Sequence, residues 1–96
     1  MSADNSIVLL ETKGPEFRVI HMQAMENIDY DDDAGEYTRN DDVRIKNARD
    51  YFKNCPVFSN KDRAFQEADR MFQEIMDSEF PILEYGIVPI KIDRAF

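Results

Sequence analysis

The segment that follows Ser59 has the periodicity of a long amphipathic helix, and any fold of this chain must cover its apolar face. Polar side chains occupy the opposite side. Ser59 suits the N-cap position, and Ser78-Glu79-Phe80-Pro81 ends the helix. The face is predicted to lie in the core, and its apolar residues are Ala64, Phe65, Ala68, Met71, Phe72, Ile75 and Met76.

Two segments near the N-terminus predict a β-hairpin. Residues 6–12 are rich in β-branched side chains and hold more apolar positions than one buried face of a strand needs. Residues 13–16 contain Gly14 and Pro15 and form the connection. Residues 17–22 place Phe17, Val19 and His21 on one face and Arg18, Ile20 and Met22 on the other.

The remaining elements are shorter or interrupted. A first helix begins after Asp41 or Asp42 as N-cap, ends at Asn54-Cys55-Pro56 and precedes the extended link Val57-Phe58. Its apolar stripe consists of Val43, Ile45, Ala48, Tyr51 and Phe52. A long strand over residues 82–92 contains Gly86 and Pro89. Because proline cannot donate to a ladder, this strand is expected at an edge or bulged there. Residues 93–96 are expected to form a tail.

Together these elements predict one α+β domain over residues 1–96. The expected architecture is a small antiparallel sheet of three to five strands with two helices on one face, in the order ββ(β)αβαβ. A small domain with a proline-interrupted edge strand is also compatible with a homodimer. The expected core residues are Ile7, Leu9, Val19, Phe52, Phe65, Ala68, Phe72, Ile75 and Ile87.

Acidic residues are concentrated in one part of the chain. The whole protein has a net charge of −8, yet residues 26–42 hold eight acids and one base, Arg39, a net charge of −7. The rest of the chain, with twelve acids and eleven bases, is almost neutral. Such crowded like charges repel one another, and they attract a positively charged partner. This acidic segment is therefore either a solvated loop or a recognition surface.

Residues 36–38 can return as a short strand, and in that case the acidic segment is the tip and flank of an ordered hairpin; otherwise it is a loop. Residues 31–35 contain Gly35, which is free to take a positive φ in a turn, and Tyr30 can pair with Tyr37 across it. If the segment is a recognition surface, its partner-binding residues are predicted to be Asp29, Tyr30, Asp31, Asp32, Asp33, Glu36, Tyr37, Asp41 and Asp42.

The sequence gives little support for a catalytic or metal-binding motif. Cys55 is the only cysteine and His21 the only histidine, so neither a disulfide nor a cysteine zinc site can form within the chain. The spacing of Asp29, Asp31 and Asp33 resembles the start of a calcium loop, but Gly35 comes one residue late. We predict no enzyme activity, no cofactor and no direct nucleic-acid binding, since phosphates would meet the acidic segment.

A polar N-terminus and the absence of a long apolar run predict a soluble protein in the cytoplasm of its host. The alternative function is a small regulatory module that binds a ligand or metal without catalysis. Its candidate groups are His21 and the acids of residues 29–33.

Three parts of the chain together carry a family resemblance. They are residues 3–7 leading into 17–28, Val57-Phe58 with the helix Ala64 to Ile75, and Glu84-Tyr85-Gly86-Ile87. This pattern resembles short acidic proteins encoded by bacteriophages and prophages. The resemblance implies a bacterial host and an inhibitor of host defence, of the anti-CRISPR or anti-restriction type.

The resemblance and the acidic segment lead to one expected function. The protein is predicted to bind a host defence nuclease or nucleic-acid-binding complex through its acidic surface, as a nucleic-acid mimic. Each carboxylate would replace a phosphate contact on a basic surface of that partner.

Overall fold

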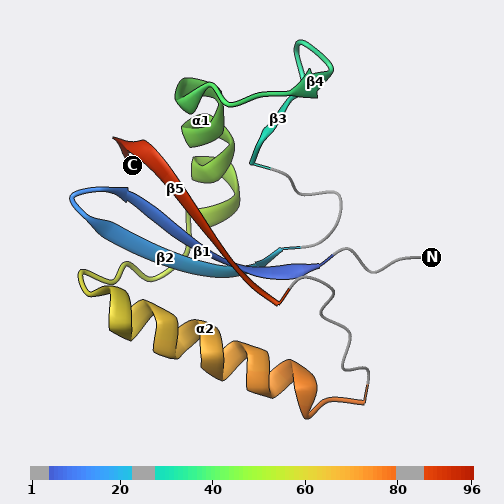
Figure 1. Ribbon diagram of the computed structural model, residues 1–96, viewed down its shortest axis with the longest axis vertical. Coiled ribbons are helices and arrows are strands. Elements are labelled where there is room, and N and C mark those ends of the chain that lie inside the picture. Colours follow the sequence, from blue (N-terminus) through green and yellow to red (C-terminus); the bar gives the residue numbers. More distant parts are fainter. Residues whose placement is uncertain (1–4, 23–27, 80–85) are drawn as a thin grey trace.

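A computed structural model describes residues 5–22, 28–79 and 86–96 of the chain. Strands β2, β1 and β5, in that order, form a three-stranded sheet, and β3 and β4 form a separate hairpin (Figure 1). The α+β class is thus confirmed. The elements are β1 (Ser6–Lys13), β2 (Glu16–Met22), β3 (Tyr30–Asp31), β4 (Glu36–Tyr37), α1 (Asp41–Phe52), α2 (Lys61–Met76) and β5 (Ile87–Ala95).

The central strand β1 is buried on both of its faces. Ile7, Val8, Leu9 and Leu10 are all at most 4% exposed, and successive side chains of a strand point to opposite faces. Val8 and Leu10 join the cluster under α1, whereas Ile7 and Leu9 join the cluster under α2. The helices therefore cover opposite faces of the sheet (Figure 1). The prediction of two helices on one face was wrong, because β1 has two apolar faces to cover.

The sheet is mixed, so the prediction of a purely antiparallel sheet was also wrong. β1 pairs antiparallel with β2 but parallel with β5, in a register that joins Ile7 to Ile87. Two helices and their connections lie between β4 and β5, which gives the chain room to return in the direction of β1. The expected strand at Val57-Phe58 is only one bridge, between Phe58 and Phe17, and the observed order is ββββααβ.

Strand β5 lies at a sheet edge, as Pro89 led us to predict. Ile7 N–H donates to Gly86 O at 2.9 Å. In a parallel ladder every second residue of a strand bonds to the same neighbour. Because Gly86 bonds to β1, the N–H and C=O groups of residue 89, three positions later, point away from β1. The N–H that proline lacks would therefore not have paired with β1. Residues 82–85 of the predicted strand lie outside the described residues.

The last residues are part of the fold. β5 continues through residues 93–95, which the sequence pattern assigned to a tail. Arg49 on α1 donates from Nε to Phe96 O at 2.7 Å and from Nη2 to Ala95 O at 3.3 Å. The guanidinium of the buried Arg18 lies 3.7 Å from the centre of the Phe96 ring. These contacts fix the end of β5 to α1 and β2.

The N-cap of α1 lies one or two residues before the predicted Asp41 or Asp42, and that of α2 lies one residue after the predicted Ser59. The Asn40 side chain accepts from Asp42 N–H at 2.9 Å and caps α1, so Asp41 and Asp42 lie in its first turn. The Asn60 side chain accepts from Asp62 N–H at 2.8 Å and caps α2, in place of Ser59. Asparagine caps helices as well as serine or aspartate, so the sequence offered neighbouring candidates of equal strength.

The predicted core is largely confirmed, with one error. Five of the nine expected residues are buried, and Phe72, Ile75 and Ile87 are partly buried against the cluster under α2. Phe65 was predicted in the core but is 52% exposed. Helix α2 approaches the sheet through Ala64 and Ala68, which are fully buried, and it lies mainly over β1 and β2. Phe65 is on the flank of this contact and projects beyond it.

Two phenylalanines provide a test of this packing. Phe52 is 1% exposed, so Phe52→Ala should lower the free energy of unfolding by about 3–5 kcal/mol. Phe65→Ala should change it by less than about 1 kcal/mol, because half of that ring is in water. Urea denaturation of both variants measures the difference. Equal losses of unfolding free energy in the two variants would show that α2 is rotated so that Phe65 faces the sheet.

Candidate functional site: an acidic hairpin

Residues 29–38 form the acidic hairpin that the sequence predicted. Tyr30 pairs with Tyr37 and Asp31 with Glu36, and the two tyrosine rings meet edge to face with centres 5.5 Å apart. Thr38 N–H donates to Asp29 O at 2.8 Å and closes the base of the hairpin. Gly35 at the tip has φ 68°, the positive value expected there.

The turn is ordered by its own polar groups. Oδ1 of Asp31 accepts from the N–H groups of Asp33 and Ala34 at 3.0 and 3.2 Å. Gly35 N–H donates to Asp31 O at 2.8 Å. A carboxylate that caps its own turn in this way holds the chain in one conformation. The carboxylates that follow it are thus carried on a defined backbone.

Helix α1 holds the base of the acidic hairpin in place. Nδ2 of Asn47 donates to Ile28 O and to Tyr30 O, both at 2.8 Å. Nε of Arg44 donates to Oδ1 of Asp29 at 2.8 Å. Arg44 and Asn47 are three residues apart and therefore lie on one side of the helix. Their contacts set the position of the hairpin relative to α1.

Three of the predicted binding residues are ion-paired. Arg44 bonds Asp29 through Nε at 2.8 Å and Asp41 through Nη1 at 3.0 Å. Nε of Arg94 on β5 lies 3.2 Å from Oδ1 of Asp42. Two arginines thus face three carboxylates, and they weaken the attraction of Asp29, Asp41 and Asp42 for a partner.

Four predicted carboxylates remain on the acidic hairpin without an ion pair to any described base: Asp31, Asp32, Asp33 and Glu36. Asp32, Asp33 and Glu36 are exposed, and the Tyr37 ring beside them is 73% exposed. Tyr30 and Asp31 are half-buried. The hairpin projects beyond α1 at one end of the molecule (Figure 1). The candidate surface is therefore these four carboxylates together with Tyr30 and Tyr37, and Glu26 lies outside the described residues.

A hollow of about 610 Å³ separates the acidic hairpin from α1. It is lined by both signs of charge, namely Asp29, Arg39 and Arg44, with Tyr37 and Thr38. Because its charges are mixed, the hollow does not extend the acidic surface. The excess negative charge is confined to the outer side and tip of the hairpin.

Sequence reasoning missed the residues that position the hairpin: Arg44, Asn47 and Arg94. A local signal existed for the first two, since a basic and an amide side chain three residues apart follow the acidic segment on a predicted helix. No local signal existed for Arg94, which is 52 residues from its partner Asp42. That ion pair depends on the return of β5 beside α1.

The candidates for a metal or small ligand are not brought together. Asp29 bonds Arg44, and Asp31 bonds backbone N–H groups of its own turn, so their oxygens face different partners. Across residues 5–22, 28–79 and 86–96, no cluster of three histidine, cysteine or acidic side chains could hold a metal ion. Nε2 of His21 is buried and has no hydrogen-bond partner among these residues.

Cys55 and His21 lie on different sides of the sheet. Cys55 packs against the cluster under α1. His21 on β2 pairs with Ile7, whose side chain belongs to the cluster under α2, so His21 faces that side. Burial raises the pKa of the Cys55 thiol, although Arg18 acts in the opposite direction. This geometry does not form a cysteine–histidine nucleophile.

Comparison of the chain with protein-family models, with curated proteins and with solved structures finds no match. None of the helices within the described residues has the length and apolar character needed to cross a membrane.

The Asn47 amide provides a test of how the acidic hairpin is held. Asn47→Ala removes both donors to the backbone of residues 28 and 30 and should destabilise the hairpin by about 1–3 kcal/mol. Amide hydrogen exchange at Thr38 and Gly35 should then accelerate by about tenfold or more, with α2 unaffected. Lys46→Ala, at an exposed neighbouring position, is the control and should leave these rates unchanged.

Proposed function

We propose that this protein is a non-catalytic inhibitor that binds a basic, nucleic-acid-binding surface of another protein through its acidic hairpin. The observation that supports it most directly is the ordered hairpin, which carries exposed carboxylates with no ion pair to a described base. Such groups keep their attraction for a positive partner, whereas Asp29, Asp41 and Asp42 are ion-paired with two arginines.

Order in the hairpin matters for binding strength. A flexible acidic loop would lose conformational entropy on contact, and that loss would weaken binding. Here the turn is closed by Asp31 and the base is held by Asn47, so the carboxylates are held in place before contact. Exposed Tyr37, which packs edge to face on Tyr30, adds an apolar anchor among the charges.

The class of partner follows from the chemistry of the surface. Proteins that hold DNA or RNA line their grooves with lysine and arginine to contact phosphates. A compact array of carboxylates competes for the same groups. The resemblance to short phage-encoded proteins favours a bacterial defence nuclease or CRISPR effector as the partner, and the proposal has both proteins meet in the bacterial cytoplasm.

The test is a comparison of charge variants in pull-downs from nuclease-treated bacterial lysate. The triple variant D31N/D32N/D33N removes three charges from the hairpin at nearly constant shape. It should lose the captured partner, and capture by the unchanged protein should fall steeply between about 0.05 M and 0.5 M salt. Added duplex DNA should displace the partner, because both occupy one basic surface.

A matched control separates local charge from net charge. D50N/D77N/E79Q changes net charge by the same three units at exposed positions away from the hairpin, and it should retain the partner. A partner held equally by both triple variants and at high salt would mean that the acidic hairpin is only a solvated turn. Binding would then belong to another surface.

A further inference from the structure

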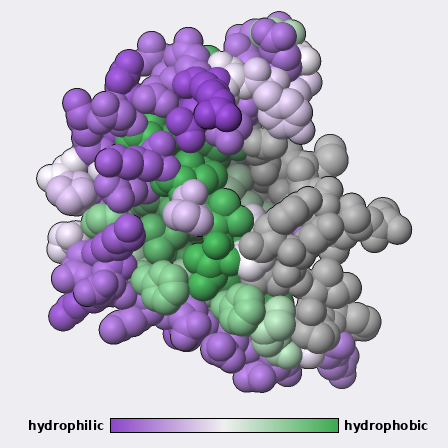
Figure 2. All heavy atoms as spheres, viewed as in Figure 1, coloured by the Kyte–Doolittle hydropathy of each residue, from purple (hydrophilic) through white to green (hydrophobic). Residues whose placement is uncertain are grey.

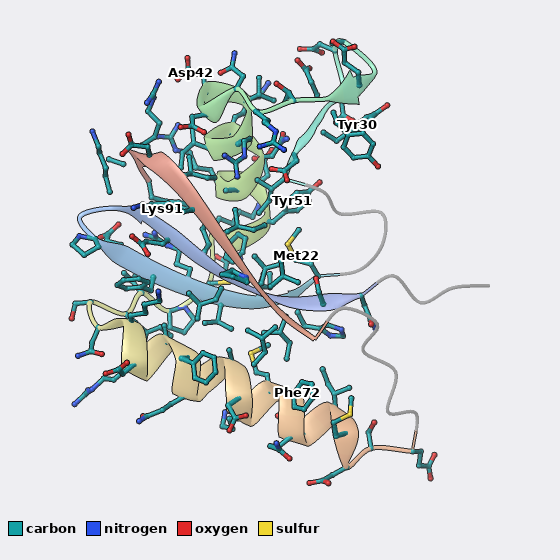
Figure 3. All side chains as sticks on the ribbon, viewed as in Figure 1. Met22, Tyr30, Asp42, Tyr51, Phe72 and Lys91 are labelled. Atoms are coloured by element: carbon teal, nitrogen blue, oxygen red, sulfur yellow. The ribbon has the colours of Figure 1, made fainter. Side chains whose placement is uncertain are left out.

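Helix α2 leaves part of the sheet uncovered. It lies mainly over β1 and β2, and beside β5 there is a groove of about 500 Å³. Its floor and walls are apolar, from Leu9, Phe65, Phe72, Ile87 and Pro89. Figure 2 shows apolar surface across the middle of the molecule, with hydrophilic residues above and below it. Phe72 lies on the side of α2 that faces the sheet (Figure 3).

Two opposite charges border this groove at equal distances from Phe65. Lys61 precedes Phe65 by four residues and Asp69 follows it by four, and both line the groove. Four residues of helix span about 6 Å along its axis, so the two charges lie roughly one turn to either side of the ring. Both are exposed, and neither forms an ion pair with a described residue.

When this order of positive, aromatic and negative groups faces a second copy running in the opposite direction, each charge lies opposite a group of the opposite sign. When two such helices lie antiparallel about a two-fold axis at Phe65, Lys61 of each meets Asp69 of the other. Two-fold interfaces are self-complementary in this way, with each residue contacting the equivalent of its partner. A foreign partner would need no such symmetry about the exposed ring.

We propose that the groove is occupied by α2 of a second copy of this chain, in a two-fold symmetric dimer. Each Phe65, 52% exposed in one copy, inserts into the groove of the other beside Pro89 and Ile87. The two Lys61–Asp69 pairs fix the antiparallel direction of the helices.

This interface lies across the sheet from the acidic hairpin (Figure 1). A dimer formed through α2 therefore leaves both acidic hairpins accessible. Such a dimer would present two binding surfaces and gain avidity for a partner with two basic sites. Dimer formation does not depend on the hairpin, so the test of the dimer and the test of the proposed function have independent outcomes.

Variants that exchange these charges test the dimer directly. Sedimentation equilibrium measures the mass of each protein from about 1 µM to about 1 mM, the range in which weak dimers dissociate. The unchanged chain should shift from 11.3 kDa toward twice that mass. K61D places two acids, and D69K two bases, on each side of the interface. Each variant alone should dissociate at least about tenfold more readily, because like charges then meet.

An equimolar mixture of K61D and D69K should form a heterodimer, since each acidic pair then faces a basic pair. Its recovery also shows that both variants are folded. Phe65→Ser should abolish the dimer, and K46D, a charge reversal on the exposed surface of α1, should leave it intact. A protein that stays monomeric at every concentration, or a dimer insensitive to these changes, would overturn the proposal.

Discussion

Burial of β1 on both faces is the constraint on which the rest of the structure depends. Ile7 to Leu10 form an uninterrupted apolar run, and in a strand such a run presents hydrophobic groups to both sides of the sheet. Covering each of these side chains contributes about 1.5–3 kcal/mol, which is large beside the usual stability of a small domain. One helix cannot cover two faces, so α1 and α2 must separate.

The two helices satisfy this constraint differently. α1 buries Ile45, Ala48 and Phe52 against one face and is joined to the end of β5 through Arg49. α2 approaches the other face through two alanines, which bring its backbone near the sheet but leave larger side chains at the margin. A sheet of three strands is wider than one helix, and on the α2 side the described residues line an apolar groove beside β5.

Charge distribution in the folded chain differs from charge distribution along the sequence. Residues 26–42 form one acidic block in the sequence, but folding brings Arg44 and Arg94 to three of its carboxylates. The remaining excess of negative charge lies at the hairpin tip, on a turn that hydrogen bonds keep in one shape. A smaller and better ordered surface results, and it is separated by the sheet from the apolar groove of α2.

Local chemistry determined much of this protein from the sequence. The β1–β2 hairpin, the Tyr30–Tyr37 pair, the positive φ of Gly35 and the edge position of β5 each follow from residue types a few positions apart. The apolar run in β1 also contained the reason for two covered faces, although the predicted architecture placed both helices on one face. The N-caps were misplaced by one or two residues because Asn40 and Asn60 lie beside equally good candidates.

Tertiary structure alone decided what depends on contacts between distant segments. The direction of β5 is set by the path of two helices, and that path brings Arg94 to Asp42 across 52 residues. The exposure of Phe65 depends on the rotation of α2, which the tight approach of Ala64 and Ala68 determines. Periodicity shows that a helix has an apolar face, but the width of the surface beneath it determines how much of that face is covered.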